Sequence, residues 1–237
     1  MKRKLGLLVI VALLLVGCAS YERELVPPKV TVGGGNTVAV LFFDNYTDDY
    51  AISHELEQKL LRTLSEYYRV LDPAETEWAL VRLGLVRGDT PNRDEAVRLG
   101  QMLGVDALIL GEVTGYFAPV TRTQPYSTQR QRQNAQGKLE FEWETTQNTR
   151  VMVSFNARVV ETRSGNVIHR QRAEGESFRD RKESVGWFVA GQQPKSWFLP
   201  GTNKIDVPDV REAALRQAAN QFTADLMPTY VWHKVEQ

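Results

Sequence analysis

The hydrophobic pattern of this chain changes between two periods, and each period predicts a different kind of element. Apolar residues run without a break at 37–43 and almost without a break at 105–113, which predicts two strands that are buried on both faces. A shorter run at 68–71 predicts a third strand. At 151–159 every second residue is apolar, so we expect a strand with one buried and one wetter face. Turn residues after it predict a hairpin to a returning strand at 167–173.

Four further stretches place an apolar residue at every third or fourth position, as an amphipathic helix does. They cover about 52–64, 73–83, 92–103 and 210–226. Asp72 is the expected N-cap of the second helix and Asp209 that of the fourth. We expect the second helix to bury its large apolar side chains, which are Trp78, Leu80, Val81 and Leu83.

The order of these elements predicts the fold class. We predict an α/β (α+β) domain in which helices flank a mixed β-sheet. The expected order is strand, helix, strand, two helices and strand, followed by a hairpin and a last helix. Two long stretches, 115–150 and 177–208, interrupt this plan, and we interpret them as insertions. Loops of this length within a compact domain are usually functional or disordered.

Both insertions carry residues of a kind that contacts a membrane or a partner. In the first, Leu139, Phe141 and Trp143 alternate with three glutamates. A membrane strand needs about 9 to 11 residues of alternating character, so this brief alternation favours an amphipathic hairpin in water. The alternative is a membrane hairpin whose three glutamates line the lumen of a pore. In the second, the aromatic residues suit a membrane interface or a cover for neighbouring protein. The candidate contact residues are Phe141, Trp143, Trp187, Phe188, Trp197 and Phe198.

The first 18 residues have the pattern of an export signal. Three cations at positions 2–4 precede an apolar segment, 5–16, that is shorter than the roughly 20 residues of a membrane-spanning helix. Residues 15–18 (LVGC) resemble the lipobox of bacterial lipoproteins, which are cut before a cysteine whose thiol has received a diacylglycerol. We therefore predict a signal peptide at 1–17 and acyl chains on Cys18, the only cysteine of the chain. By resemblance to bacterial sorting rules, the lack of an Asp after Cys18 suggests the outer membrane.

Residues 18–36 separate this anchor from the first strand. They contain two prolines at 27–28, three glycines at 33–35 and few apolar residues, which predicts a flexible tether. Such a tether spans at most about 60 Å, so the folded part stays near its membrane. The remaining residues, 37–237, are expected to form a single domain.

Composition and motif spacing argue against several classes of function. After removal of the signal, the 29 Lys and Arg of the full chain fall by three to 26, against 29 Asp and Glu, so no nucleic-acid partner is expected. The three histidines, His54, His169 and His233, are scattered, and no pair has metal-ligand spacing. The acidic turn at 44–49 lacks the glycine and the terminal glutamate of a calcium loop. We find no catalytic constellation, and we expect no enzymatic activity, metal or cofactor.

Several of these segments together resemble a known family. They are 38–45 (VAVLFFDN), 68–71 (YRVL), 100–113 (GQMLGVDALILGEV) and 159–168 (VVETRSGNVI), and their order is similar to that of the curli secretion-channel lipoproteins of CsgG type. PelC-like and LpoB-like lipoproteins look like relatives of the same fold. The resemblance implies a periplasmic α/β domain on an outer-membrane lipid anchor, without catalysis and often assembled into rings. In the curli channel two hairpins per subunit come from insertions at places that roughly correspond to those of this chain.

These observations lead to one hypothesis and two alternatives. The first is a lipoprotein on the periplasmic face of the outer membrane, held there by acyl chains on Cys18. It self-associates, as a ring or a pore, and forms a non-catalytic part of a secretion or envelope-assembly system with a protein partner in that system. The first alternative is a monomeric, LpoB-like tethered module that activates a peptidoglycan synthase. The second is a periplasmic hydrolase.

Overall fold

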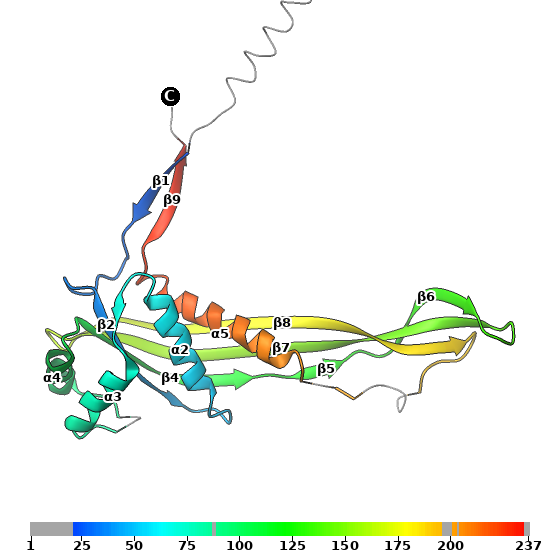
Figure 1. Ribbon diagram of the computed structural model, residues 1–237, viewed down its shortest axis with the longest axis horizontal. Helices are drawn as coiled ribbons and strands as arrows, with labels where there is room; N and C mark the ends of the chain where they lie inside the picture. Colours follow the sequence, from blue (N-terminus) through cyan, green and yellow to red (C-terminus); the bar gives the residue numbers. More distant parts are fainter. Residues whose placement is uncertain (1–20, 87–88, 196–200, 203, 235–237) are drawn as a thin grey trace, which may run out of the picture.

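A mixed sheet of seven strands forms the centre of the molecule (Figure 1). The computed structural model describes residues 21–86, 89–195, 201–202 and 204–234. The strands of the sheet are β2 (Thr37–Asn45), β3 (Arg69–Val70), β4 (Ala107–Phe117), β5 (Val120–Arg122), β6 (Tyr126–Gln133), β7 (Leu139–Glu161) and β8 (Val167–Val189). β2 pairs in parallel with β3 and β4, whereas β7 pairs antiparallel with β4, β5, β6 and β8. The predicted α/β (α+β) fold, a mixed sheet with flanking helices, is therefore confirmed.

Helices cover both faces of the sheet because its central strands are apolar on both sides. α2 (Ile52–Leu64) and α5 (Val207–Thr223) pack on one face. α3 (Pro73–Arg82) and α4 (Arg93–Leu103) pack on the other, over β2 and the start of β4. The helix at 52–64 has the predicted bounds, and its buried stripe is the predicted one.

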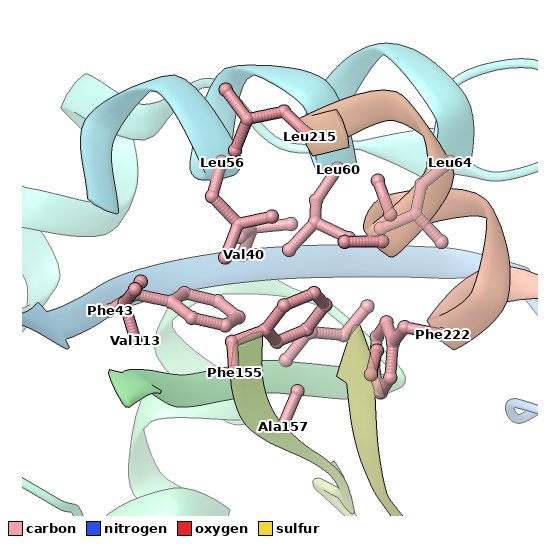
Figure 2. Close-up of a cluster of buried hydrophobic side chains, with 14 of the residues drawn as sticks. Val40, Phe43, Leu56, Leu60, Leu64, Val113, Phe155, Ala157, Leu215 and Phe222 are labelled. Carbon is pink, nitrogen blue, oxygen red and sulfur yellow. The ribbon is translucent and has the colours of Figure 1, made fainter. Parts of the chain in front are cut away.

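The larger of the two cores is centred on Phe155 of β7 (Figure 2). Its ring contacts the rings of Phe43 and Phe222 edge to face, each at a centroid distance of 5.9 Å. α5 approaches this core closely because β8 carries Gly175 beneath it. A Cβ atom at Gly175 would lie 1.9 Å from the carbonyl oxygen of Ala214, so a larger residue would push α5 away from the sheet.

The prediction that the second helix buries all of its large apolar residues was wrong. Trp78 is 58% exposed and Val81 is 67% exposed, whereas Ala79 and Leu80 are buried. α3 contacts the sheet through a narrow strip, so residues one position away from Ala79 and Leu80 face solvent. The Trp78 ring is covered instead by the guanidinium of Arg82, 4.8 Å from the ring centroid.

The last helix begins earlier than predicted. α5 starts at Val207, so Asp209 lies in its first turn and is not the N-cap. Asp206 occupies the cap position, but its carboxylate makes no side-chain cap bond. It lies 2.6 Å from the guanidinium of Arg181 instead. This ion pair fixes the start of α5 against β8.

The stretches at 115–150 and 177–208, interpreted as insertions, are joined to each other by strand pairing. β7 and β8 are each 23 residues long and pair from Glu140 opposite Val189 to Val160 opposite Val167, with two shifts of register on the way. Most of the first insertion and the start of the second are thus the outer part of one hairpin. Figure 1 shows it projecting beyond the helices, with β6 along its outer edge. We call residues 126–150 and 177–189 the arm.

The flexible tether predicted for 18–36 is ordered over much of its length. β1 (Tyr21–Val26) pairs antiparallel with β9 (Thr229–Lys234), and we call this pair the ribbon. After the prolines the chain joins the domain, because Val32 is buried and the amide of Val30 donates to the carbonyl of Asp225. The tether was predicted from local composition, whereas the partner strand comes from the opposite end of the chain. The predicted signal peptide, 1–17, lies outside the described residues.

Candidate functional site

The tip of the arm brings together four of the six candidate contact residues. Phe141 lies opposite Phe188 in the β7–β8 register, and Trp143 lies opposite Gly186, so these three side-chain positions share one face. Trp187 lies opposite Glu142 on the other face. All four candidates are half-buried and none is fully exposed. The other two, Trp197 and Phe198, lie outside the described residues, as does Cys18.

Ion pairs cover the second face of the tip. The Nε atom of Arg132 lies 2.8 Å from the carboxylate of Glu140, and its guanidinium lies 4.5 Å from the centre of the Trp187 ring. Hydrogen bonds from Arg132 and then from Asn134 lower the pKa of Glu140. Arg130 lies 3.3 Å from Glu142 in the same way. Two of the glutamates that alternate with Leu139, Phe141 and Trp143 are thus paired with cations.

The middle of the arm has a polar interior. Thr145, Gln147 and Thr149 are all buried, and β5 pairs with this part of β7. Arg122 of β5 crosses this interior and lies 2.6 Å from the carboxylate of Glu183. It also donates to the carbonyl of Gly201 at 3.0 Å. Hydrogen bonds and a buried ion pair have strict geometry, so this interior favours a single arrangement of the arm.

A groove with both signs of charge lies where α3 and α4 stop covering the sheet. It has a volume of about 520 Å³ and is lined by Asp44, Glu112, Arg158 and Arg170, among other residues. Burial, and then the charge of Glu112, raise the pKa of Asp44. Burial, and then the like charge of Arg170 on the neighbouring strand, lower the pKa of Arg158. The groove therefore offers both cationic and anionic contacts to a charged partner.

An apolar stripe crosses the sheet beyond this groove, and sequence reasoning missed it. Phe117 lies opposite Met152 in the β4–β7 register, and Phe178 is diagonal to Met152 on β8. Their side chains are 60%, 39% and 73% exposed, in that order. They lie on the face of the sheet opposite α5, beyond the part that α3 and α4 cover. We call this uncovered part the open face. Phe178 stands alone among polar residues in the sequence, so only its pairing with β7 reveals the stripe.

Histidines and acidic residues are dispersed over the part of the chain that the structure describes. No three of its His, Cys, Asp or Glu residues there are grouped so that they could hold a metal ion. His54 lies beside Glu57 and His233 beside Glu24, while His169 lies 5.8 Å from the Phe222 ring. No helix among the described residues is both long and apolar enough to cross a bilayer. The surfaces on the arm and the open face are suited to binding.

Comparison with known proteins gives one family and several solved structures. The model of the curli production assembly/transport component CsgG matches residues 68–237. A lipoprotein from Neisseria meningitidis is 18% identical with a TM-score of 0.40, over 68% of this chain and 89% of its own. The LpoB C-terminal domain from Salmonella enterica is 14% identical with a TM-score of 0.39, over 60% and 84%. The PelC dodecamer from Paraburkholderia phytofirmans is 13% identical with a TM-score of 0.34, over 87% and 97%. No curated protein sequence matches.

Proposed function

The chain belongs to the CsgG family, named for the curli production assembly/transport component, and from this we propose a role in envelope assembly or secretion. In this role the protein is a non-catalytic lipoprotein of the outer membrane, and copies of it assemble side by side on the periplasmic face. The observation that carries the proposal is the arm together with the open face at its base. An exposed apolar patch among polar residues is typical of an interaction site.

The open face has the composition of a protein–protein interface. Phe117, Met152 and Phe178 form an exposed apolar stripe over three neighbouring strands. Aromatic residues and methionine are enriched at interface centres, and polar residues at their rims. Here Arg150 lies opposite Phe178 and Glu176 lies opposite Met152, and the two charged side chains, 2.5 Å apart, form an ion pair among the apolar ones. A second copy of the chain is the occupant that this proposal assigns to the open face.

The chemistry of the arm supports a role in water. On the inner face of β7, the apolar residues at the tip give way to Thr145, Gln147 and Thr149. Opposite them on β8 lie Glu183, Arg181 and Arg179. A strand in contact with lipid needs an apolar band along about 9 to 11 residues, which this pattern lacks. We therefore assign the arm to contacts between subunits, or with a partner protein, outside the membrane.

The short reach of the chain disfavours the alternative, a monomeric module that activates a peptidoglycan synthase. The domain begins at Val30, which bonds to Asp225. Val30 is twelve residues after Cys18, and this stretch spans at most about 40 Å. Pairing with β9 fixes residues 21–26 as a strand, which adds no further reach. The domain therefore stays close to the membrane that holds its anchor, where side-by-side assembly is favoured.

Cysteine cross-linking in native membranes tests the proposed assembly. Because lipidation consumes the thiol of Cys18, the only native cysteine, an introduced cysteine becomes the reactive one. A short bismaleimide is expected to convert most of a Phe178→Cys variant into covalent dimers. The matched control is Tyr50→Cys, which is 91% exposed and precedes α2 on the other face of the sheet. Equal cross-linking of the two variants would show that the open face is not the interface.

A further inference from the structure

The ribbon is amphipathic in a way that its sequence does not reveal until β1 and β9 are paired. Residues directly opposite each other in an antiparallel pair lie on the same face. One face therefore holds Arg23 with Trp232 and Leu25 with Tyr230, and it includes Lys234 at its outer end. The other face holds Glu22 with His233 and Glu24 with Val231. We call the first of these the aromatic face of the ribbon.

The aromatic face is exposed. Leu25 and Tyr230 are each 52% exposed, and Trp232 is 62% exposed. The guanidinium of Arg23 lies 3.4 Å from the centre of the Tyr230 ring and 6.0 Å from that of Trp232. Large aromatic and aliphatic side chains thus stand beside two cations, with no carboxylate on the same face. The acidic residues, Glu22 and Glu24, are confined to the opposite face.

The ribbon stands apart from the domain. Figure 1 shows β1 and β9 projecting away from the sheet and its helices. Among the described residues, they form a sheet of two strands. An isolated pair of strands is marginally stable at best in water, because it has nothing against which to bury an apolar face. The aromatic face therefore calls for a partner outside this chain's own core.

From these observations we propose that the aromatic face of the ribbon binds the lipid surface next to the anchor. This inference rests on the proposed lipidation of Cys18. Tyr21, the first residue of β1, is three residues after Cys18, and three residues span at most about 11 Å. The outer end of the ribbon is thus held at the level of the headgroups. Trp and Tyr concentrate at that level in membrane proteins.

The distribution of charge on the ribbon also suits contact with a lipid surface. Arg23 and Lys234 lie on the aromatic face, where they meet lipid phosphates. Glu22 and Glu24 lie on the face directed to water, and His233 lies 2.9 Å from Glu24 there. A ribbon docked in this way gives the domain a second point of attachment. It sets the orientation of the domain on the membrane, which a single flexible anchor does not.

Vesicle binding by the unlipidated protein tests this inference without the anchor. The protein is the mature chain with Cys18→Ala, and the vesicles contain phosphatidylethanolamine and phosphatidylglycerol. One variant, Tyr230→Ser with Trp232→Ser, removes the aromatic rings. Its matched control, Thr229→Ser with Val231→Ser, changes the other face of the same strand. We expect the first to weaken co-sedimentation at least about tenfold, and the control to change it by less than about twofold.

Three results would overturn the inference. They are no binding by the Cys18→Ala protein, an equal loss in both variants, or a Cys18→Ala dimer that the Tyr230 and Trp232 changes dissociate. The last result would assign the ribbon to a second copy of the chain. Thermal unfolding of all variants checks that the domain is intact. Because the Cys18→Ala protein has no acyl chains, vesicle binding reports on the ribbon alone. Its result can therefore be told apart from a failure of the proposed lipidation or of assembly through the open face.

Discussion

Replacement of Cys18 by alanine is expected to move nearly all of the protein from the membrane fraction to the soluble periplasm. Each buried methylene of an acyl chain contributes about 0.8 kcal/mol, so two or three chains anchor far more firmly than any surface contact. The variant is made behind an ordinary cleavable signal peptide, because the predicted lipoprotein signal at 1–17 would be cut only after lipidation of the cysteine. A high-salt wash screens the charges of the ribbon before the fractions are compared.

The control keeps the native signal and carries Ser20→Ala, which leaves Cys18 in place. This variant stays in the membrane, and its mass includes the acyl chains. Retention of the Cys18→Ala protein at the wild-type level, after the wash, would contradict the prediction of a lipid anchor. It would also show that protein surfaces alone hold the domain on the membrane.

Phe155→Ala is expected to lower the free energy of unfolding by about 3 to 5 kcal/mol. The Phe155 ring is fully buried between Phe43 and Phe222 (Figure 2), so its removal loses transfer energy and leaves a cavity. In a domain of this size each kcal/mol shifts the melting temperature by about 2 to 4 °C. A decrease of roughly 6 to 20 °C in circular dichroism melting is therefore expected.

Tyr50→Ala is the matched control for that change, since it removes an aromatic ring outside both the core and the open face. Tyr50 is 91% exposed, so its loss alters the free energy of unfolding by less than about 0.5 kcal/mol. A similar decrease in melting temperature for both variants would show that Phe155 is not at the centre of the core.

Much of the fold could be predicted because its signals are local. The runs in β2 and β4 are apolar over more residues than a half-buried strand allows, and they are the strands that helices cover on both sides. The start of α4 has a complete local signature. Asn92 accepts from the amide of Glu95, and the Glu95 carboxylate accepts from the amide of Asn92. Such hydrogen bonds form within one turn of the helix and do not depend on residues far away in the sequence.

The arm could not be predicted because its buried residues are polar. Thr145, Gln147 and Thr149 show no apolar alternation, yet each is fully buried. Thr145 donates to the carbonyl of Thr123, and Gln147 accepts from Arg122, which also donates to the carbonyl of Gly201. Burial of this kind depends on segments far apart in the sequence. The same is true of the ribbon, whose two strands come from opposite ends of the chain.

The candidate site was predictable in part. Alternation around Phe141 and Trp143 marked the arm's tip, and pairing placed Trp187 and Phe188 beside them. The hydrophobic pattern of α3 predicted the helix, but it did not show how narrow the contact of α3 with the sheet is. Trp78 was therefore predicted to be buried, whereas it is exposed. The roles of Cys18, Trp197 and Phe198 stay predictions. The stripe on the open face has no local signal, because its three residues lie on three different strands.

The most direct test of the proposed assembly is the mass of the lipidated protein in mild detergent, measured by light scattering with the detergent contribution subtracted. We expect a single species that contains at least two subunits, which Phe178→Glu reduces to the monomer by placing a charge in the stripe on the open face. A wild-type protein that is monomeric at every concentration would contradict assembly through the open face. It would favour the tethered binding module instead.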